Sequence, residues 1–282
     1  MVLDIVFMDG KPQAAVPGGS VFNAMVSLGR TTSDIPVMMV SQIGEDKVSD
    51  IVLEFMNRNN VRPDWVKLVP KTQTTVSMAM LSSSGDASYE FFRDRTAPDF
   101  EAPAIDFQPD DIVLFGSFFA VDDNTREQTR SLVRAARDAG ATVYYDINFR
   151  KNHLVDLPKL ISEIEENCRL ASIVRGSSED VECVWGFSDG KKAYEEKMRS
   201  LCPRFIYTSG AGNVEIFWNG DHRTYPVKPI EVVSTIGAGD NFNAGFIRSL
   251  LDSDDIDSAV RCALRFSAAV CQSLENYVPL DF

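Results

Sequence analysis

The sequence predicts an α/β fold: a mostly parallel central sheet in three layers, with helices on both faces and a small β extension. Short apolar runs rich in Val, Ile and Phe recur along the chain, and most are followed by a segment with helical spacing, which is the pattern of a helix-covered parallel sheet. At 282 residues and 44% hydrophobic, the chain can also bury a large core. We therefore expect one main domain spanning 1–282.

These patterns predict the following strands and helices along the chain. The apolar runs predicted as strands are 2–7, 37–41, 112–115, 142–147, 172–174 and 205–208. The segments predicted as helices are 20–28, 46–57, 125–139, 157–168 and 191–201. In the helix over 46–57, five apolar residues fall on one face, which predicts a single buried stripe.

Two strand pairs interrupt the alternation of strands and helices. Residues 74–81 and 87–92 are β-prone and are separated by the turn-rich stretch Ser82–Asp86, which predicts a hairpin. A second pair, 213–218 and 222–227, turns through Asn219-Gly220-Asp221. From its pattern alone, the first hairpin is either a lid that closes over a substrate or a simple edge extension.

Composition excludes several classes of function. With 41 acidic and 28 basic residues, the formal net charge is −13, which disfavours nucleic acid and anionic membranes as partners. The five cysteines are widely spaced and never in a Cys-x-x-Cys arrangement, so we expect reduced thiols and a cytoplasmic protein. Two histidines offer little material for a zinc site or a Ser-His-Asp triad. No apolar run is long enough for a membrane span.

The most informative segment is Ser234–Gly245, a glycine turn that leads into a run with helical spacing. The stretch Gly237-Ala238-Gly239 leaves room for backbone N–H groups to approach an anion at a helix N-terminus. Asp240 follows in the first turn, where its anionic form is stabilised and can accept a proton from an attacking hydroxyl. The alternative is a tight turn with an Asp cap and no chemistry.

Two other nucleotide motifs are disfavoured. The dinucleotide fingerprint requires a third Gly or Ala where this chain has Phe242, and it normally follows the first strand. The stretch Gly186–Lys192 is one residue short of a P-loop, and Lys192 replaces the Ser or Thr that would bind Mg²⁺. We interpret it as a solvated loop.

A second glycine turn, Gly18-Gly19, opens the helix that carries Asn23. The amide of Asn23 supplies both a donor and an acceptor, as sugar hydroxyls require, although Gly-Gly-Ser before a helix is often only a cap. Asp4, in the first predicted strand, is either an edge charge or a carboxylate acceptor for vicinal hydroxyls.

Five motifs in the same order make the chain resemble the ribokinase-like, or PfkB, family of carbohydrate kinases. They are Gly18-Gly19 with Asn23-Ala24 and Leu28-Gly29, Ile43–Asp46, Tyr145–Arg150, Thr208–Gly210 and Thr235–Asp240. The resemblance covers nearly the whole chain. It implies a three-layer ribokinase-like fold with lid elements at about 10–17 and 72–95.

The resemblance also implies roles for individual residues. Sugar hydroxyls would be bound by Asp4, Gly18, Gly19 and Asn23, with Arg93 and Arg150 as further cleft residues. Gly237, Ala238 and Gly239 would hold the transferring phosphoryl group, and Asp240 would be the base. The nucleotide would contact Thr208, Gly210, Thr235 and Asn243. The segment 174–180 resembles the family's Asn-x-x-Glu region and would organise Mg²⁺ through water by Asp180, or by Glu179 in an alternative register.

Three departures from the family pattern qualify these roles. Ser234 stands where the C-terminal signature begins with an Asp that helps to hold a monovalent cation in several relatives, so dependence on such a cation is uncertain. Ser177 and Asp180 replace the longer Asn and Glu of the metal region. The chain also begins at the strand with Asp4, without the Gly-Glu segment that usually precedes it.

The sequence therefore favours an ATP- and Mg²⁺-dependent sugar kinase, fructokinase-like and acting on a primary hydroxyl. The alternatives are a nucleoside or other small-alcohol kinase of the same family, and a catalytically inactive sugar-binding relative. The resemblance also implies a homodimer through the lid, because lid hairpins of this kind often pair across a dimer, and an exposed sheet edge gives that pairing a physical motive.

Overall fold

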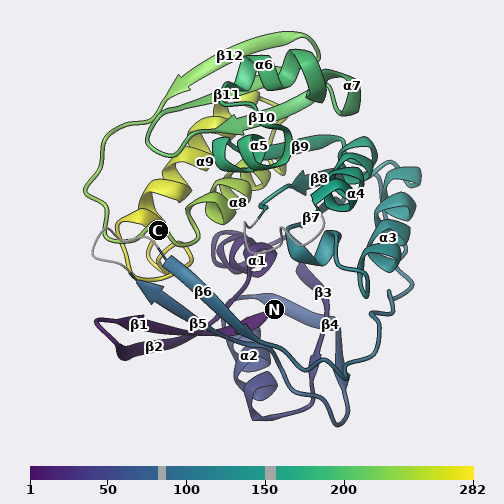
Figure 1. The fold of residues 1–282 in the computed structure, drawn as a ribbon, viewed down its shortest axis with the longest axis vertical. Helices are drawn as coiled ribbons and strands as arrows, with labels where there is room; N and C mark the ends of the chain where they lie inside the picture. Colours follow the sequence, from purple (N-terminus) through teal and green to yellow (C-terminus); the bar gives the residue numbers. More distant parts are fainter. Residues whose placement is uncertain (82–86, 150–156) are drawn as a thin grey trace. The chain divides into compact units, whose positions relative to one another are not determined.

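The computed structural model describes residues 1–81, 87–149 and 157–282. The chain forms two compact units. One, here called the terminal unit, contains residues 1–99 and 230–282, and the other, the middle unit, contains residues 100–229. Figure 1 shows the elements of both units along the chain.

The middle unit contains a six-stranded sheet with the strand order β12-β11-β10-β9-β8-β7. Neighbouring strands from β7 to β10 are parallel, and β11 and β12 add an antiparallel edge. The strands are β7 (Ile112–Gly116), β8 (Thr142–Asp146), β9 (Ile173–Ser177), β10 (Arg204–Thr208), β11 (Asn213–Trp218) and β12 (Asp221–Pro226). Residues 143–146 are all buried, as expected for a parallel strand that is covered on both faces.

The helices of the middle unit are mostly short. They are η1 (Phe118–Ala120), α3 (Arg126–Asp138), α4 (Leu157–Leu170), α5 (Ser178–Trp185), α6 (Gly190–Ala193), the π-helical turn η3 (Tyr194–Met198) and α7 (Arg199–Leu201). Helices α3 and α4 pack against each other and against β8, and α5 packs on β9. The core joins β-strand residues such as Val143 and Phe205 to helix residues such as Val133 and Ile164.

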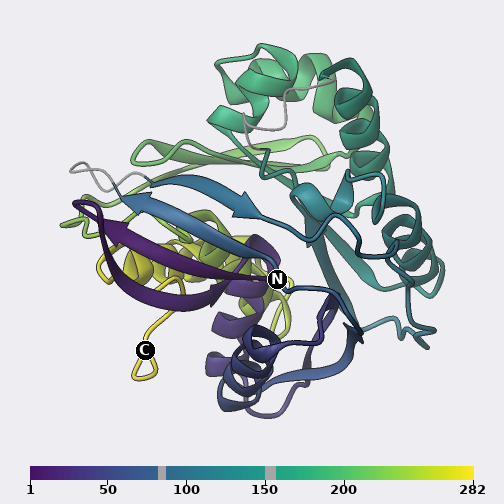
Figure 2. The same ribbon diagram turned by 60° about the horizontal axis from the view of Figure 1, so that its bottom comes forward.

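The terminal unit contains two separate sheets. The first has four strands in the order β2-β1-β5-β6, namely β1 (Val2–Met8), β2 (Lys11–Gly18), β5 (Val76–Leu81) and β6 (Ala87–Phe92). Figure 2 shows this sheet as the purple and blue arrows. The second is a parallel pair, β3 (Val37–Gly44) and β4 (Val61–Val69).

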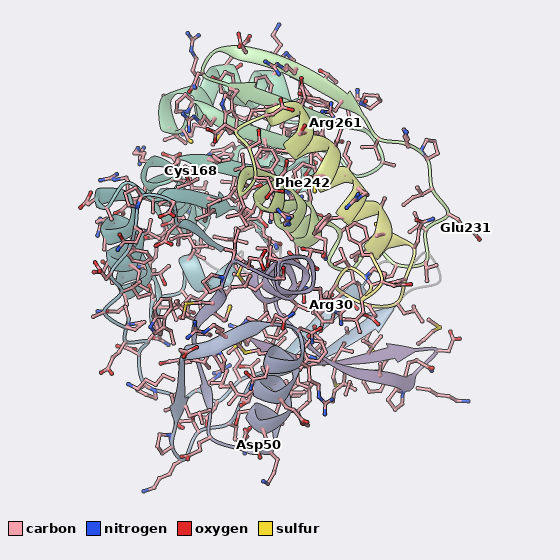
Figure 3. The ribbon with its side chains drawn as sticks, turned by 180° about the vertical axis from the view of Figure 1, so that it is seen from behind. Arg30, Asp50, Cys168, Glu231, Phe242 and Arg261 are labelled. Carbon is pink, nitrogen blue, oxygen red and sulfur yellow. The ribbon has the colours of Figure 1, made fainter. Side chains whose placement is uncertain are left out.

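The described helices of the terminal unit are α1 (Ser20–Thr31), α2 (Lys47–Arg58), α8 (Ala238–Leu250) and α9 (Ile256–Cys271). Helix α8 packs against both α1 and α9, and Figure 3 shows α8, with Phe242, beside α9, with Arg261. The α8–α9 contact needs a glycine in α8, because a Cβ on Gly245 would lie 2.7 Å from the Cα of Ala263. The packing brings α1 and α8, more than 200 residues apart in sequence, into contact.

The strands and helices predicted from sequence are all present, with ends that differ by a few residues. The hairpin strands are β5 and β6, whereas the predicted turn at 82–86 lies outside the described residues. The structure adds β4, η1, α5 and α9, which the sequence analysis did not identify, and it shows a strand, β2, in the expected lid element at about 10–17. It also shows that β1 is an inner strand between β2 and β5, so Asp4 is buried and is not an edge charge.

Candidate active site

The start of helix α8 forms the predicted glycine turn. Gly237 is the N-cap residue and has a left-handed conformation (φ 76°), and a Cβ there would lie 2.7 Å from the carbonyl oxygen of Asn276. The Ala238 N–H donates to the Thr235 carbonyl (3.2 Å). Apart from this N–H of Ala238, the N–H groups of the first helical turn have no acceptor within the helix, so they are available to an anion at this end.

Asp240 lies in that first turn and is bound by Asn23 of helix α1. The Asn23 Nδ2 donates to Asp240 Oδ2 at 2.8 Å, and the two residues are only 4% and 6% exposed. The backbone N–H of Asn23 donates to Gly19 O at 2.8 Å, which ties the Gly18-Gly19 turn to the same helix. The two glycine turns of the sequence analysis therefore belong to helices that are joined by side-chain hydrogen bonds, one of them between Asn23 and Asp240.

Asn23 also has an acceptor that no group in the described part of the chain satisfies. Among the described residues, its buried Oδ1 has no hydrogen-bond partner. A buried acceptor left without a donor costs about 1–3 kcal/mol, and a ligand hydroxyl would remove that cost. The amide of Asn23 is thus arranged to hold a carboxylate with its NH₂ and a hydroxyl with its oxygen.

Asp4 is fixed by two neighbours in the terminal unit. The Ser77 hydroxyl on β5 donates to Asp4 Oδ1, across a directly paired position of the two strands. A Cβ on Gly18 would lie 2.1 Å from Asp4 Oδ2, so residue 18 must be glycine for the carboxylate to occupy its place. Glycine is also favoured at residue 19, where φ is 118°. The structure therefore joins Asp4 to Gly18, and Asn23 to Asp240, as two contacting pairs.

The structure describes one of the two arginines that were expected near the sugar. Arg93 directly follows β6 and is exposed, with its guanidinium 5.0 Å from the centre of the Phe91 ring. Arg150 lies outside the described residues. The Ser77–Asp4 bond is a feature that sequence reasoning missed, because the two residues lie 73 positions apart.

The residues expected to contact a nucleotide lie in both units. In the middle unit, Thr208 ends β10 and accepts a hydrogen bond from Arg175 Nη2 (2.7 Å), and Gly210 follows with φ 50° and open space at its Cβ position. In the terminal unit, Thr235 is exposed, and Asn243 is buried in α8.

Arg175, which the sequence analysis did not identify, is the centre of a buried charged group in the middle unit. Its Nη1 donates to Asp146 Oδ1 at 3.1 Å, in addition to its bond to Thr208. Burial opposes the charge of Arg175, but Asp146 and Asp180 outweigh that effect and raise the pKa of the guanidinium. A lone Arg in the apolar strand Ile173–Ser177 was the only available signal in the sequence.

Asp180 and Glu179 occupy different environments at the start of α5. Asp180 is buried, and its carboxylate accepts from Ser177 N (2.7 Å), Ser177 Oγ (2.7 Å) and Phe149 N (2.6 Å). Burial raises the pKa of Asp180, although Arg175 acts in the opposite direction. Glu179, one residue earlier, is exposed. Over 1–81, 87–149 and 157–282, no group of three or more His, Cys, Asp or Glu residues forms a metal cluster.

A glycine-led helix N-terminus with a buried carboxylate in its first turn combines an anion site with a proton acceptor, which is what transfer of a phosphoryl group to a hydroxyl requires. The chain belongs to the pfkB family of carbohydrate kinases, whose family model matches residues 10–281. It is a kinase of this family, and its fold is ribokinase-like α/β, as the sequence predicted.

Individual relatives agree with the family assignment. The chain is 27% identical to a fructokinase of Rhizobium leguminosarum bv. trifolii, over 84% of this chain and 72% of the relative. It is 26% identical to a 2-dehydro-3-deoxygluconokinase of Haemophilus influenzae, over 95% and 91%. A crystal structure of Vibrio cholerae O395 fructokinase with fructose, ADP and calcium superimposes with a TM-score of 0.89 at 19% identity, covering 99% of this chain and 92% of the other.

Among the described residues, none of the helices has the length and apolar character needed to cross a bilayer.

Proposed function

We propose that this chain is an ATP-dependent kinase that phosphorylates a hydroxyl of a free ketose, as a fructokinase does. The proposal depends on one observation above all: Asp240, in the first turn of a glycine-led helix, is held by Asn23 through a 2.8 Å hydrogen bond. That arrangement combines a proton acceptor and an anion site at one helix end.

The chemistry assigned to these groups is a single phosphoryl transfer. Asp240 accepts the proton of the sugar hydroxyl, and the oxygen attacks the γ-phosphorus of ATP as the bond to the β-phosphate oxygen breaks, which releases ADP. The turn Gly237-Ala238-Gly239 would hold the charge on the transferring phosphoryl group through its backbone N–H groups, of which that of Ala238 also donates to the Thr235 carbonyl at 3.2 Å. Fixed donors at such a position typically contribute about 10²–10³-fold to kcat.

The sugar-binding residues favour a neutral substrate. Asp4 and the free Oδ1 of Asn23 are hydrogen-bond acceptors, which match sugar hydroxyls. The negative charge of Asp4 would repel a second phosphate group on the sugar. Gly18 and Gly19 would contribute backbone groups to sugar binding. We also propose Arg93 and Arg150 as cleft residues, and their positive charge is a feature that would favour a phosphorylated sugar over a neutral one.

On the nucleotide side, we assign Thr208 and Gly210 of the middle unit, and Thr235 and Asn243 of the terminal unit, to ATP. Mg²⁺, when bound, would neutralise charge on the phosphate oxygens. Glu179 fits a water-mediated magnesium contact, because it is exposed and hard oxygen ligands suit this ion. Asp180 fits it less well, since three protein donors already occupy its carboxylate.

The oligomeric state is a separate part of the proposal. Strands β2 and β6 form the edges of the four-stranded sheet, and β6 carries the exposed Phe92. An edge of this kind can pair with a second copy, so we propose a homodimer through this sheet as a lid. Light scattering coupled to size exclusion would test it, and a monomer at micromolar concentration would refute it.

A coupled ADP-release screen with Mg-ATP tests the proposed function. The substrates are fructose, ribose, 2-keto-3-deoxygluconate, tagatose 6-phosphate, fructose 6-phosphate and adenosine. We expect the highest kcat/KM for fructose or another free ketose. A preference of about tenfold or more, or about 1.4 kcal/mol, for a sugar phosphate or for adenosine would contradict the assignment. Absence of ADP formation with all substrates would favour an inactive sugar-binding relative.

A further inference from the structure

Asn241, the residue after Asp240, is fully buried and uses both hydrogens of its side-chain amide on backbone carbonyls. Its Nδ2 donates to Gly237 O at 2.8 Å and to Asn276 O at 2.8 Å. One carbonyl belongs to the N-cap of α8, and the other belongs to the chain segment after α9. The amide therefore links the glycine turn to a segment 39 positions further along the chain.

The acceptor of the same amide is occupied as well. The Ser27 hydroxyl of α1 donates to Asn241 Oδ1, and Ser27 Oγ in turn accepts from the Val278 N–H at 3.1 Å. With partners at both ends, the amide has one orientation in which all its bonds are satisfied. Helix α1, the start of α8 and the segment 276–278 are thus joined at one buried point.

The segment 276–278 is itself held in place by Arg30 of α1. The Arg30 Nη1 donates to Val278 O (2.6 Å) and to Glu275 Oε2 (2.7 Å), and its guanidinium lies 5.1 Å from the centre of the Tyr277 ring. Arg30 is labelled in Figure 3, which shows the molecule from behind the view of Figure 1. Asn241 therefore anchors the glycine turn to a fixed support.

We propose that Asn241 is a positioning residue: its amide holds the Gly237 turn so that the turn's N–H groups meet the transferring phosphoryl group. The inference rests on the proposed function, which assigns those N–H groups to that group. Gly237 has no side chain to restrict its own conformation, so the turn depends on outside contacts. A displacement of about 1 Å in such a site can cost about 10²-fold in rate.

The test compares two equally buried amides. Asn241→Ala removes the link to the turn. Asn167→Ala is the matched control, because Asn167 is also fully buried, donates to Ala120 O (2.9 Å) and accepts from Arg130 Nε (3.1 Å), in the middle unit. Both variants should lose thermal stability. Well below the two melting temperatures, we expect Asn241→Ala to lower kcat by about 10²-fold and Asn167→Ala to leave it within about twofold.

A binding readout separates positioning from catalysis. ADP lacks the transferring phosphoryl group, whereas a non-hydrolysable ATP analogue carries its equivalent. We expect Asn241→Ala to raise the Kd of the analogue about tenfold relative to that of ADP, as loss of a hydrogen bond to a charged group would. Asn167→Ala should leave the ratio unchanged. Calorimetry measures both constants without turnover, so this result stands even if every sugar fails as a substrate and the proposed function is wrong.

Ser27→Ala serves as a milder variant if Asn241→Ala does not fold. It leaves Asn241 in place but removes the donor that orients its amide, so kcat and the Kd ratio should shift in the same direction by a smaller factor. If the folded variants keep the kcat and the Kd ratio of Asn167→Ala, the inference is wrong and Asn241 only stabilises the fold.

Discussion

The side-chain amide of Asn23 donates to the carboxylate of Asp240 at 2.8 Å, although the two residues lie 217 positions apart. The bond fixes one oxygen of the proposed base, and among the described residues the buried Oδ1 of Asn23 has no donor of its own. The residue expected from sequence to bind sugar is thus in contact with the residue expected to remove the proton. This pair is the basis of the predictions that concern catalysis.

Asn23→Asp should move the pH dependence of catalysis. Two buried carboxyl groups in contact cannot both ionise easily, so the pKa of the pair rises. A base with a raised pKa is protonated at higher pH, so the acidic limb of kcat/KM should move upward by more than about one pH unit. Rate profiles from pH 5 to 9 measure the shift. Asn213→Asp, an exposed change with the same charge, is the control, and equal profiles for both variants would contradict the role of the pair.

Gly18→Ala should weaken sugar binding by displacing Asp4. The new Cβ would lie 2.1 Å from Asp4 Oδ2, a distance at which the carboxylate must move. We expect the KM for the sugar to rise about tenfold or more, as after loss of a hydrogen bond to a charged group, with the Kd for ADP unchanged. Asp4→Asn should also raise the KM for the sugar. If Gly18→Ala binds sugar normally, Asp4 does not contact it.

Potassium should activate the enzyme only weakly. Ser234 replaces the Asp that begins the family's C-terminal signature, and its buried hydroxyl accepts from the Ile236 N–H at 3.2 Å. A neutral hydroxyl that already binds a backbone N–H offers little charge to a cation. Activity at millimolar K⁺ is compared with a tetramethylammonium control. Strong activation would mean that other oxygen atoms are sufficient to bind the ion.

The sequence predicted much of this site because its signals are local. Gly237 adopts the left-handed conformation expected of a glycine turn, and Asp240 lies in the first turn of the helix that follows. Contacts between distant segments could not be predicted in the same way. The Asn23–Asp240 and Ser77–Asp4 bonds, and the link from Asn241 to Asn276, depend on how helices and strands pack, which no local pattern specifies.

The strands of the fold, too, could be predicted from sequence only where a local pattern specifies them. The resemblance implies a lid element at about 10–17, but the pattern of β2 does not by itself predict a strand, because prolines at 12 and 17 are typical of loops. The strand lies at a sheet edge, where proline is tolerated. A local signal did exist, since Asp9-Gly10 has positive φ at both positions and forms the β1–β2 turn. The position of β1 inside the four-stranded sheet follows from its parallel pairing with β5, about 70 residues away, and a parallel partner cannot be identified from the strand's own pattern.

Asp46→Asn should reduce stability in a pH-dependent way. Asp46 accepts from Ser49 N (2.8 Å) and Thr74 N (2.7 Å), and so ties the start of α2 to the segment before β5. Burial acts to raise its pKa, but these hydrogen bonds outweigh that effect and lower it. Because the folded pKa is below the unfolded value, the carboxylate stabilises the fold above about pH 4, and this contribution is lost as the pH falls through the folded pKa.

Asparagine has one acceptor oxygen and no charge, so it cannot accept from both Ser49 N and Thr74 N as the two oxygens of Asp46 do. The melting temperature of Asp46→Asn should therefore be lower than that of the wild type at pH 7, by about 2–4 °C for each 1 kcal/mol of stability lost. The difference should shrink as the pH approaches 3. Asp64→Asn, which removes an exposed carboxylate paired with Arg62, provides a surface comparison. A difference for Asp46→Asn that stays constant from pH 7 to pH 3 would show that the carboxylate charge is not what matters.

The kcat of Asp240→Asn at saturating Mg-ATP and sugar tests the proposed mechanism most directly. Asparagine keeps the size of the side chain and its capping ability, but it cannot accept the proton. With a normal melting curve and normal ADP binding, we expect kcat to fall by about 10²–10⁴-fold, as for loss of a general base. If the folded variant keeps more than about a tenth of the wild-type kcat, which is well short of that loss, Asp240 is not the base.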